Sequence, residues 1–412
     1  MDQLNLALAA VGIVVIVLGL LSQPLNRSVF SLPLMAFLFG VSIGPVGLGL
    51  LDVDQWGDPV RIMEEGARLT LGISLMGIAL RIPRAYIFTH WRTFVVLLGL
   101  GMPLMFLVSS LLVYWLLGVP LLLAMLVGAA ICPTDPVVSS SMVTGSLAKA
   151  SLPGRFRHTL SAESGANDGL AYLLVLLPML LLSAKDTSTA WSEWLTHALL
   201  WEVGGAIIFG VLTGWLFGQA LQWAERNKTI DHASFLAATL ALTVLVLGVG
   251  KLIGTDSLLA VFAAGIAFDQ VVGGSERAEE GSVQESVNLF FTLPIFVLFG
   301  LMIPVAQWFE LGWPGVALAV LVLLLRRLPV LLLLRPLMPR WREMRMALTA
   351  GYFGPIGISA LFYAMMIDSR AGHDIAWTVG SLVVCASLFA HGMGAAPGAK
   401  LYARLYPGDN DS

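Results

Sequence analysis

The sequence predicts an all-α membrane protein with about thirteen transmembrane helices, two of them interrupted near the middle of the bilayer. Of its 412 residues, 58% are hydrophobic and only 12% are charged, whereas a soluble domain carries about 25% charged residues. Apolar segments long enough to span a bilayer recur along the whole chain. Two of these segments hold proline and glycine in their interior, where an ordinary helix would break.

The apolar segments follow one another with short connections between them. A transmembrane helix needs about 20 residues to cross the hydrocarbon core of a bilayer. Segments of this kind lie at 4–22, 29–48, 61–82, 92–117, 120–147, 157–183, 195–222, 233–250, 256–272, 286–306, 312–334, 345–367 and 374–396. The first follows an acidic start and is expected to be a retained helix rather than a signal peptide. The longest polar stretch, 273–286, is expected to be a loop, so that 1–412 forms a single transmembrane domain.

The lysines and arginines of the connecting loops are unevenly distributed between the two sides of the membrane. One set of alternate loops holds most of them, including Arg81, Arg84, Lys149, Arg155 and Arg340. The opposite set holds only Arg61, Lys185, Lys251 and Arg370. Since positively charged loops stay in the cytoplasm, we expect the N-terminus outside and the C-terminus in the cytoplasm. The chain is then a multi-pass protein of the plasma membrane, which is the inner membrane in a bacterium.

The fifth segment is interrupted by the sequence CPTDP at 132–136. Pro133 and Pro136 cannot continue a regular helix. Asp135 lies between them, about 15 residues into the segment and therefore roughly 22 Å along a helix. Backbone groups that are freed at this depth must be buried in protein or line a cavity. The sequence therefore predicts a polar cavity where this helix unwinds.

The twelfth segment carries a second interruption, GYFGPIGIS, with Gly354 and Pro355 near its middle. Segments five and twelve are an odd number of spans apart, so they cross the membrane in opposite directions. Interrupted helices at matching places in two halves are typical of transporter sites. We therefore expect inverted repeats over 1–183 and 233–396, linked by the helix 195–222, with the two broken helices crossing. Two unrelated proline kinks are the alternative.

The sixth segment carries polar residues on one side of an otherwise apolar helix. Glu163 and Asn167 are four residues apart, and so are Ser164 and Asp168, so these side chains form a polar stripe. Asp168 lies about 12 residues from the cytoplasmic start of the helix, roughly 18 Å deep. Acids at this depth need a cavity or a cationic partner. A structural ion pair is the alternative to ion binding, and it is favoured more for Glu163 than for Asp168.

The sequence TDP at 134–136, followed by ESGAND at 163–168, resembles the motifs of the monovalent cation/proton antiporters, most closely those of the NhaP and sodium–proton exchanger branch. The thirteen-segment layout extends this resemblance over nearly the whole chain. The resemblance implies an NhaA/NhaP-like antiporter fold, a homodimer and no cofactor. It also implies that a monovalent cation and H⁺ are exchanged across the lipid bilayer.

The same resemblance assigns expected roles to the polar residues of the two motifs. Asp168 would be the carboxylate that binds cation and proton in turn. Thr134 and Asn167 would bridge the unwound fifth helix to the sixth, while Asp135 and Ser164 would lie at the ion. The cation ligands would then come from Asp168, Thr134 and Ser164.

Two positions depart from the family pattern. Glu163 would be a structural acid paired with an arginine, but the usual G-x-R-G motif of the twelfth helix reads GYFG here, with Phe353 in the arginine's place. A third-helix acid is missing near Met76. Arg326 and Arg327 lie deep in the eleventh segment, where an unpaired arginine is costly. We expect a structural ion pair between Glu163 and Arg327, with Arg326 as the second candidate. Snorkelling to the interface is the alternative.

These residues together favour a secondary antiporter, with Na⁺ as the first candidate cation and K⁺ or Li⁺ as the others. Electrogenic members of the family carry two adjacent aspartates where this chain has Asn167 and Asp168, so we expect electroneutral exchange. A cation channel is the main alternative, and it would need a continuous pore. An intramembrane aspartyl enzyme using Asp135 and Asp168 is a weaker alternative. No H-E-x-x-H motif is present, so we expect no enzymatic activity, and no nucleic acid partner is expected.

Overall fold

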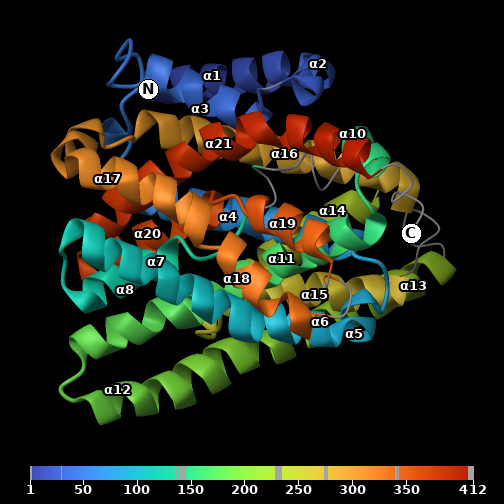
Figure 1. Ribbon diagram of the computed structural model, residues 1–412. Helices are drawn as coiled ribbons and strands as arrows, with labels where there is room; N and C mark the ends of the chain where they lie inside the picture. Colours follow the sequence, from blue (N-terminus) through green and yellow to red (C-terminus); the bar gives the residue numbers. More distant parts are fainter. Residues whose placement is uncertain are drawn as a thin grey trace.

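The computed structural model describes residues 2–28, 30–135, 138, 145–227, 234–272, 277–338, 341 and 343–406. All secondary structure in these ranges is helical, which confirms the predicted fold class (Figure 1). The elements are α1 (Asp2–Leu20), α2 (Ser22–Arg27), α3 (Leu32–Ile43), η1 (Val53–Gln55), α4 (Pro59–Arg81), α5 (Tyr86–Thr89), α6 (Trp91–Val96), η2 (Leu97–Gly101), α7 (Met102–Leu117), α8 (Leu121–Ala130), α10 (Gly145–Ser151), α11 (Gly154–Ser183), α12 (Thr187–Glu193), η3 (Trp194–Gly204), α13 (Gly205–Arg226), α14 (Ser234–Leu252), α15 (Ser257–Val272), α16 (Arg277–Leu301), α17 (Val305–Leu325), α18 (Leu328–Leu334), η4 (Arg335–Leu337), α19 (Met344–Tyr352), α20 (Ile358–Ala371) and α21 (Ile375–Leu405).

Several helices in these ranges are long and apolar enough to cross a membrane, by length and composition. They are Gln3–Leu20, Trp91–Leu117, Gly154–Ser183, Thr187–Arg226, Val305–Leu337 and Ile375–Leu405. The chain is therefore an integral, multi-pass membrane protein. In Figure 1 the long helices lie alongside one another, with α1 at one edge of the bundle and α12 at the opposite edge. The number of thirteen spans stays a prediction.

The structure differs from the expected segments in the stretch 273–286. α16 begins at Arg277, so most of this stretch is helical and the expectation of a loop is wrong. The loop was expected because the stretch is polar. It contains the sequence RAEE, however, and these residues are strong helix formers. α3 is also shorter than the expected 29–48, because it ends at Ile43, just before a glycine and a proline.

The seventh helical segment is longer than the expected 195–222. It extends over Thr187–Arg226 and includes a π-helical stretch, η3. Its last part, α13, packs on α15 through Gly210, Gly214 and Gly218, where any side chain would collide with α15. Small residues at this spacing let two membrane helices approach closely. The pair of α13 and α15 is therefore tightly packed, and α15 also contacts α11.

α11 passes through the interior of the bundle and contacts α4, α8, α15 and α20. Its buried residues include Glu163, Ser164, Asn167 and Asp168, the polar stripe expected from the sequence. The stripe faces protein rather than lipid, as buried acids require. α11 thus places these side chains between the two interrupted segments, α8–α10 and α19–α20.

Candidate ion-binding site

The first interruption follows α8. Residues 131–135 are not helical, and all of them are buried. Pro133 has no N–H to donate and disfavours helical geometry at the residue before it, so the helix does not continue through this point. Pro136, the other proline expected to break the helix, lies outside the described residues. The last carbonyls of α8 are left without helical partners and need other donors.

The second interruption separates α19 from α20 at residues 353–357, which are not helical. Gly354 and Pro355 lie in this stretch, as the sequence indicates. Gly357 ends it, and a side chain there would collide with the carboxylate of Asp135. The backbone of the second interruption therefore approaches the first as closely as glycine allows.

Gly357→Ala is expected to lower the free energy of unfolding by about 1–3 kcal/mol, as overpacking does, because its methyl group would overlap the Asp135 carboxylate. Gly248→Ala is the matched control, since open space surrounds Gly248 on α14 and alanine is the better helix former. Thermal unfolding in detergent should show a lower midpoint for the first variant only. Equal midpoints would show that the two interruptions do not touch at Gly357.

Asp135 joins the two interruptions. Its N–H donates to the carbonyl of Pro355 (2.9 Å), and its Oδ2 accepts from the N–H of Ile358 (2.7 Å). Ile358 is the first residue of α20, where free N–H groups and the helix dipole favour a negative charge. The Asp135 carboxylate is therefore held at this helix end. The crossing of the two helices, as distinct from this contact, stays a prediction.

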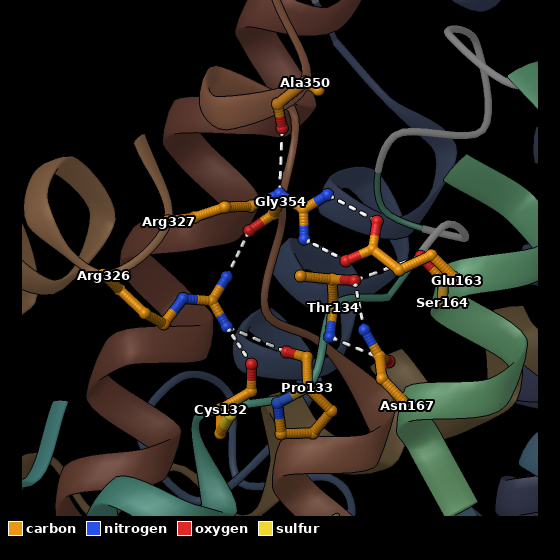
Figure 2. Close-up of polar contacts among 10 residues, drawn as sticks. All are labelled: Cys132, Pro133, Thr134, Glu163, Ser164, Asn167, Arg326, Arg327, Ala350 and Gly354. Atoms are coloured by element: carbon orange, nitrogen blue, oxygen red, sulfur yellow. Dashed lines mark hydrogen bonds and ion pairs between the residues drawn. The ribbon is translucent and has the colours of Figure 1, made fainter. Parts of the chain in front are cut away.

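Arg326 lies between α17 and α18 and is almost completely buried. Its Nη1 donates to the carbonyls of residues 131–133, at 2.8, 2.6 and 2.9 Å. Its Nη2 donates to the carbonyl of Gly354, so one guanidinium binds both interruptions (Figure 2). The carbonyl end of a helix carries partial negative charge, which this arginine offsets. It therefore binds backbone carbonyls, whereas the sequence offered it as a second candidate partner for Glu163.

Glu163 and Arg327 form a bidentate ion pair. Nη1 contacts Oε1 and Nη2 contacts Oε2, both at 2.6 Å, and each side chain is only 1% exposed. The Nε of Arg327 also donates to the carbonyl of Ala350 in α19 (2.8 Å; Figure 2). Phe353, at the place of the family arginine, is buried and lies edge-on to Tyr352 at 4.7 Å. The carboxylate of Glu163 is thus paired from the eleventh segment instead of the twelfth.

Thr134, Ser164 and Asn167 link the first interruption to α11. The Thr134 N–H donates to Asn167 Oδ1 (3.3 Å), and Asn167 Nδ2 donates to Thr134 Oγ1 (2.9 Å). The hydroxyls of Thr134 and Ser164 share a hydrogen bond of 3.1 Å. The structure thus brings together the residues that the sequence expected to bridge these segments, as Figure 2 shows.

Asp168 follows Asn167 on α11 and is 2% exposed. Its Oδ1 has no hydrogen-bond partner within the described part of the chain. Ser359 of α20 lies beside the Asp168 carboxylate, and its hydroxyl interacts with that carboxylate. Tyr363 donates to the backbone carbonyl of Asp168 at 2.5 Å rather than to its carboxylate. A buried carboxylate in this state needs a proton or a cation to neutralise it.

The sequence reasoning missed Ser359 and Tyr363, and it also missed two residues of α21. Ser387 Oγ accepts from the N–H of Ile356 (2.8 Å) and shares a hydrogen bond with His391 Nδ1 (3.1 Å). His391 Nε2 lies 2.9 Å from the carbonyl of Tyr352. Both ends of the second interruption are thus held from α21. Ser387 and His391 are four residues apart in an apolar segment, the same signal that revealed the stripe on α11.

Most of the charged groups around the site have a partner of opposite charge. Glu163 is matched by Arg327, Asp135 by the positive end of α20, and the carbonyl ends by Arg326. Asp168 is the one buried acid of this group without a cationic partner among the residues described. The arrangement therefore offers one carboxylate for a positive ion, and this carboxylate interacts with Ser359 and Asp135.

The family model of the transmembrane sodium/hydrogen exchangers matches residues 11–400 of the chain. A Na⁺/H⁺ antiporter of Saccharomyces cerevisiae is 32% identical over 373 residues, which cover 89% of this chain and 38% of that protein. A Na⁺/H⁺ antiporter of Schizosaccharomyces pombe is 30% identical over 418 residues, which cover 95% of this chain and 89% of that protein. The chain therefore spans well under half the length of the Saccharomyces protein and most of the Schizosaccharomyces one.

The fold is also similar to a solved structure, that of the sodium proton antiporter MjNhaP1 from Methanocaldococcus jannaschii. The TM-score is 0.79 at 19% sequence identity, over 98% of this chain and 99% of the other. At this identity the likeness speaks for the fold alone. It confirms the NhaP-like fold that the sequence predicts.

Proposed function

Because the chain belongs to the sodium/hydrogen exchanger family, we propose that it exchanges a monovalent cation, with Na⁺ as the first candidate, for H⁺ across the membrane. The proposal rests on the state of the Asp168 side chain. Its carboxylate is buried and has an unpartnered oxygen, and it lies where α11 meets both interrupted segments. The two relatives named above, a yeast and a fission-yeast Na⁺/H⁺ antiporter, support sodium as the cation.

A proton and a sodium ion compete for the same carboxylate in this proposal. Either one neutralises Asp168, and oxygen ligands suit a hard cation such as Na⁺. The hydroxyls of Thr134 and Ser164, which share a hydrogen bond, would supply such oxygens, while Asn167 keeps Thr134 in place. An empty, charged site is costly to move through the low-dielectric interior. Movement therefore requires a bound ion, which couples the two flows.

Alternating access would come from a rigid-body rocking motion. The moving part would hold both interrupted segments together with α11, α17, α18 and α21, since these elements form the site and its supports. The remaining helices would form the frame and the interface of a homodimer. In this proposal the N-terminus lies outside the plasma membrane, as the distribution of Lys and Arg in the loops indicates.

The test of the function is a pH gradient imposed on proteoliposomes that contain the full chain. Addition of Na⁺, K⁺ or Li⁺ should dissipate the gradient, followed by a pH-sensitive dye, and the cation panel ranks the substrates. A protein-dependent conductance without proton movement would favour the cation channel and overturn the antiporter. Protein-free liposomes and the Asp168→Asn variant are the controls.

Exchange is expected to be electroneutral, one proton for one cation. Glu163 is held by Arg327 and Asp135 by the N-terminus of α20, so only Asp168 changes its state during the cycle. A membrane potential is worth about 2.3 kcal/mol per elementary charge per 100 mV, and it should leave the transport equilibrium unchanged. The measurement sets a potassium–valinomycin potential at fixed ion gradients. A shift in the pH gradient at which transport reverses would mean that a second carboxylate titrates.

A further inference from the structure

A second group of polar side chains lies one turn beyond Asp168 on α11. We call it the Glu202 cluster, made up of Tyr172 (α11), Glu202 (η3), Asp256 (between α14 and α15) and Arg370 (α20). The N–H of Asp256 donates to the carbonyl of Glu202 at 2.9 Å. Arg370 Nη1 donates to the hydroxyl of Tyr172 at 3.1 Å and lies over its ring. Each of the two acids interacts electrostatically with the other and with Arg370.

Both acids of the cluster have a buried oxygen without a protein partner. Asp256 is 7% exposed, and its Oδ1 caps α15 by accepting from the N–H groups of Leu258 (3.0 Å) and Leu259 (3.2 Å). Its Oδ2 has no partner in the part of the chain that the structure describes. Glu202 Oε2 has no partner within normal hydrogen-bond distance among the described residues either, whereas Oε1 lies 3.4 Å from His197 Nδ1, and the Tyr172 hydroxyl interacts with the Glu202 carboxylate. The helix cap and His197 therefore account for two of the four carboxylate oxygens.

The charge of the cluster is not balanced. Two neighbouring carboxylates in a buried site do not stay ionised together unless a positive charge lies between them. The nearby cationic groups are Arg370, which also binds Tyr172 and interacts with Glu64 of α4, and His197, whose side chain is 59% exposed. The described residues contain no group of three or more His, Cys, Asp or Glu side chains arranged to hold a metal ion. Carboxylate oxygens suit hard cations rather than soft transition metals, and the monovalent cation of the proposed antiport is a hard cation.

The cluster lies next to Asp168 along the chain and in space. Tyr172 follows Asp168 by one helical turn, about 6 Å along the axis. Tyr363 donates to the carbonyls of Asp168 and Gly169 and interacts electrostatically with both Asp168 and Asp256. Tyr363 therefore stands between the two acidic sites. The C-terminal end of α11, which this cluster approaches, is the outer end in the orientation proposed above.

We propose that Glu202 and Asp256 form a staging site that holds the transported monovalent cation on the face where α11 ends, before it reaches Asp168 or after it leaves. This inference rests on the proposed antiport. It assigns a role to Glu202, which lies in the π-helical stretch η3, and π-helical turns occur frequently at functional sites. The staging site would attract the cation to one face only, because Asp168 alone serves both faces.

The test compares Glu202→Gln and Asp256→Asn with the control Glu310→Gln. Asparagine keeps the oxygen that caps α15, and Glu310 is an exposed acid on α17, outside the cluster. The full chain is reconstituted in proteoliposomes, and the KM for Na⁺ is measured separately with Na⁺ presented to each face. Both variants should raise the KM on the face where α11 ends by about two- to fivefold, the effect of losing a partly screened charge. The kcat and the KM on the other face should not change, and the control should behave like wild type.

Unchanged KM values on both faces, or equal changes on both faces, would overturn the staging site. A shift in the pH profile without any change in KM would also overturn it, because it would mean that the acids share a proton. If Glu202→Gln does not fold, calorimetric titration of Na⁺ into Asp168→Asn tests the staging site instead. Residual Na⁺ binding is expected in that variant. This binding should be lost in Asp168→Asn/Asp256→Asn. Sodium-dependent proton movement by the wild type is read in the same experiment. Its absence would defeat the proposed function, whereas its presence with unaltered variants would defeat the staging site alone.

Discussion

Asp168→Asn is expected to abolish cation-driven proton movement while the protein still folds and inserts into the membrane. Asparagine has the same shape but can neither take up a proton nor carry the charge that attracts a cation. The Asp168 side chain makes no ion pair with a described residue, so its replacement removes a desolvated acid without leaving a charge unpaired. Its thermal stability should therefore equal or exceed that of the wild type. Proteoliposome transport and thermal unfolding in detergent measure the two effects.

Asp186→Asn is the matched control for this variant. Asp186 is an exposed aspartate that caps α12 by accepting from the N–H of Thr189 (2.8 Å), and asparagine caps a helix as well as aspartate does. The control should transport at the wild-type rate. Robust transport by Asp168→Asn would contradict the assignment of Asp168 as the ion-binding carboxylate. Loss of transport in both variants would indicate a general effect of replacing aspartate by asparagine.

Removal of either member of the Glu163–Arg327 pair is expected to lower the free energy of unfolding by about 3–5 kcal/mol, because it leaves a buried charge without its partner. Both side chains are 1% exposed, and both carboxylate oxygens are bound. Replacing both residues together, as in Glu163→Gln/Arg327→Met, should restore much of the loss, since neither charge is then left alone. The midpoint of thermal unfolding in detergent orders these variants.

The Glu65–Arg68 pair of α4 is the control for a surface ion pair. Its side chains are 45% and 19% exposed, and Glu65 also pairs with Lys251, which is 48% exposed. Ion pairs of this kind contribute only about 0–1 kcal/mol each. Glu65→Gln should therefore shift the midpoint far less than Glu163→Gln. Equal shifts in the two variants would show that the Glu163 pair is open to water.

Hydropathy and motif spacing predicted much of the fold, because the length and apolar composition of a membrane helix can be recognised in the sequence. The helix over 157–183 corresponds to α11, and the two interruptions occur where proline and glycine accumulate. Helix boundaries at polar ends were less accurate. α16 extends into a stretch expected to be a loop, since a helix that leaves the apolar region no longer needs apolar residues.

The partners of the buried residues were harder to predict. Arg326 binds backbone carbonyls of the two interruptions, and a carbonyl leaves no trace in the residue types of its segment. The eleventh segment, expected over 312–334, is divided into α17 and α18 at Arg326 and Arg327, just before Pro329, and both side chains bind groups of the site. Tyr363 binds α11 through a backbone carbonyl as well. Contacts between side chains and backbone therefore had to come from the structure.

Asp168 is expected to exchange a bound proton for a cation. The most direct test measures the protons released when Na⁺ binds, by calorimetric titration of the purified full chain in buffers of different ionisation enthalpy. Cation binding to a protonated ligand releases its proton, so the wild type should release up to one proton for each Na⁺ bound, and Asp168→Asn should release none. Proton release that persists in Asp168→Asn, or that exceeds one proton for each Na⁺ in the wild type, would contradict the account.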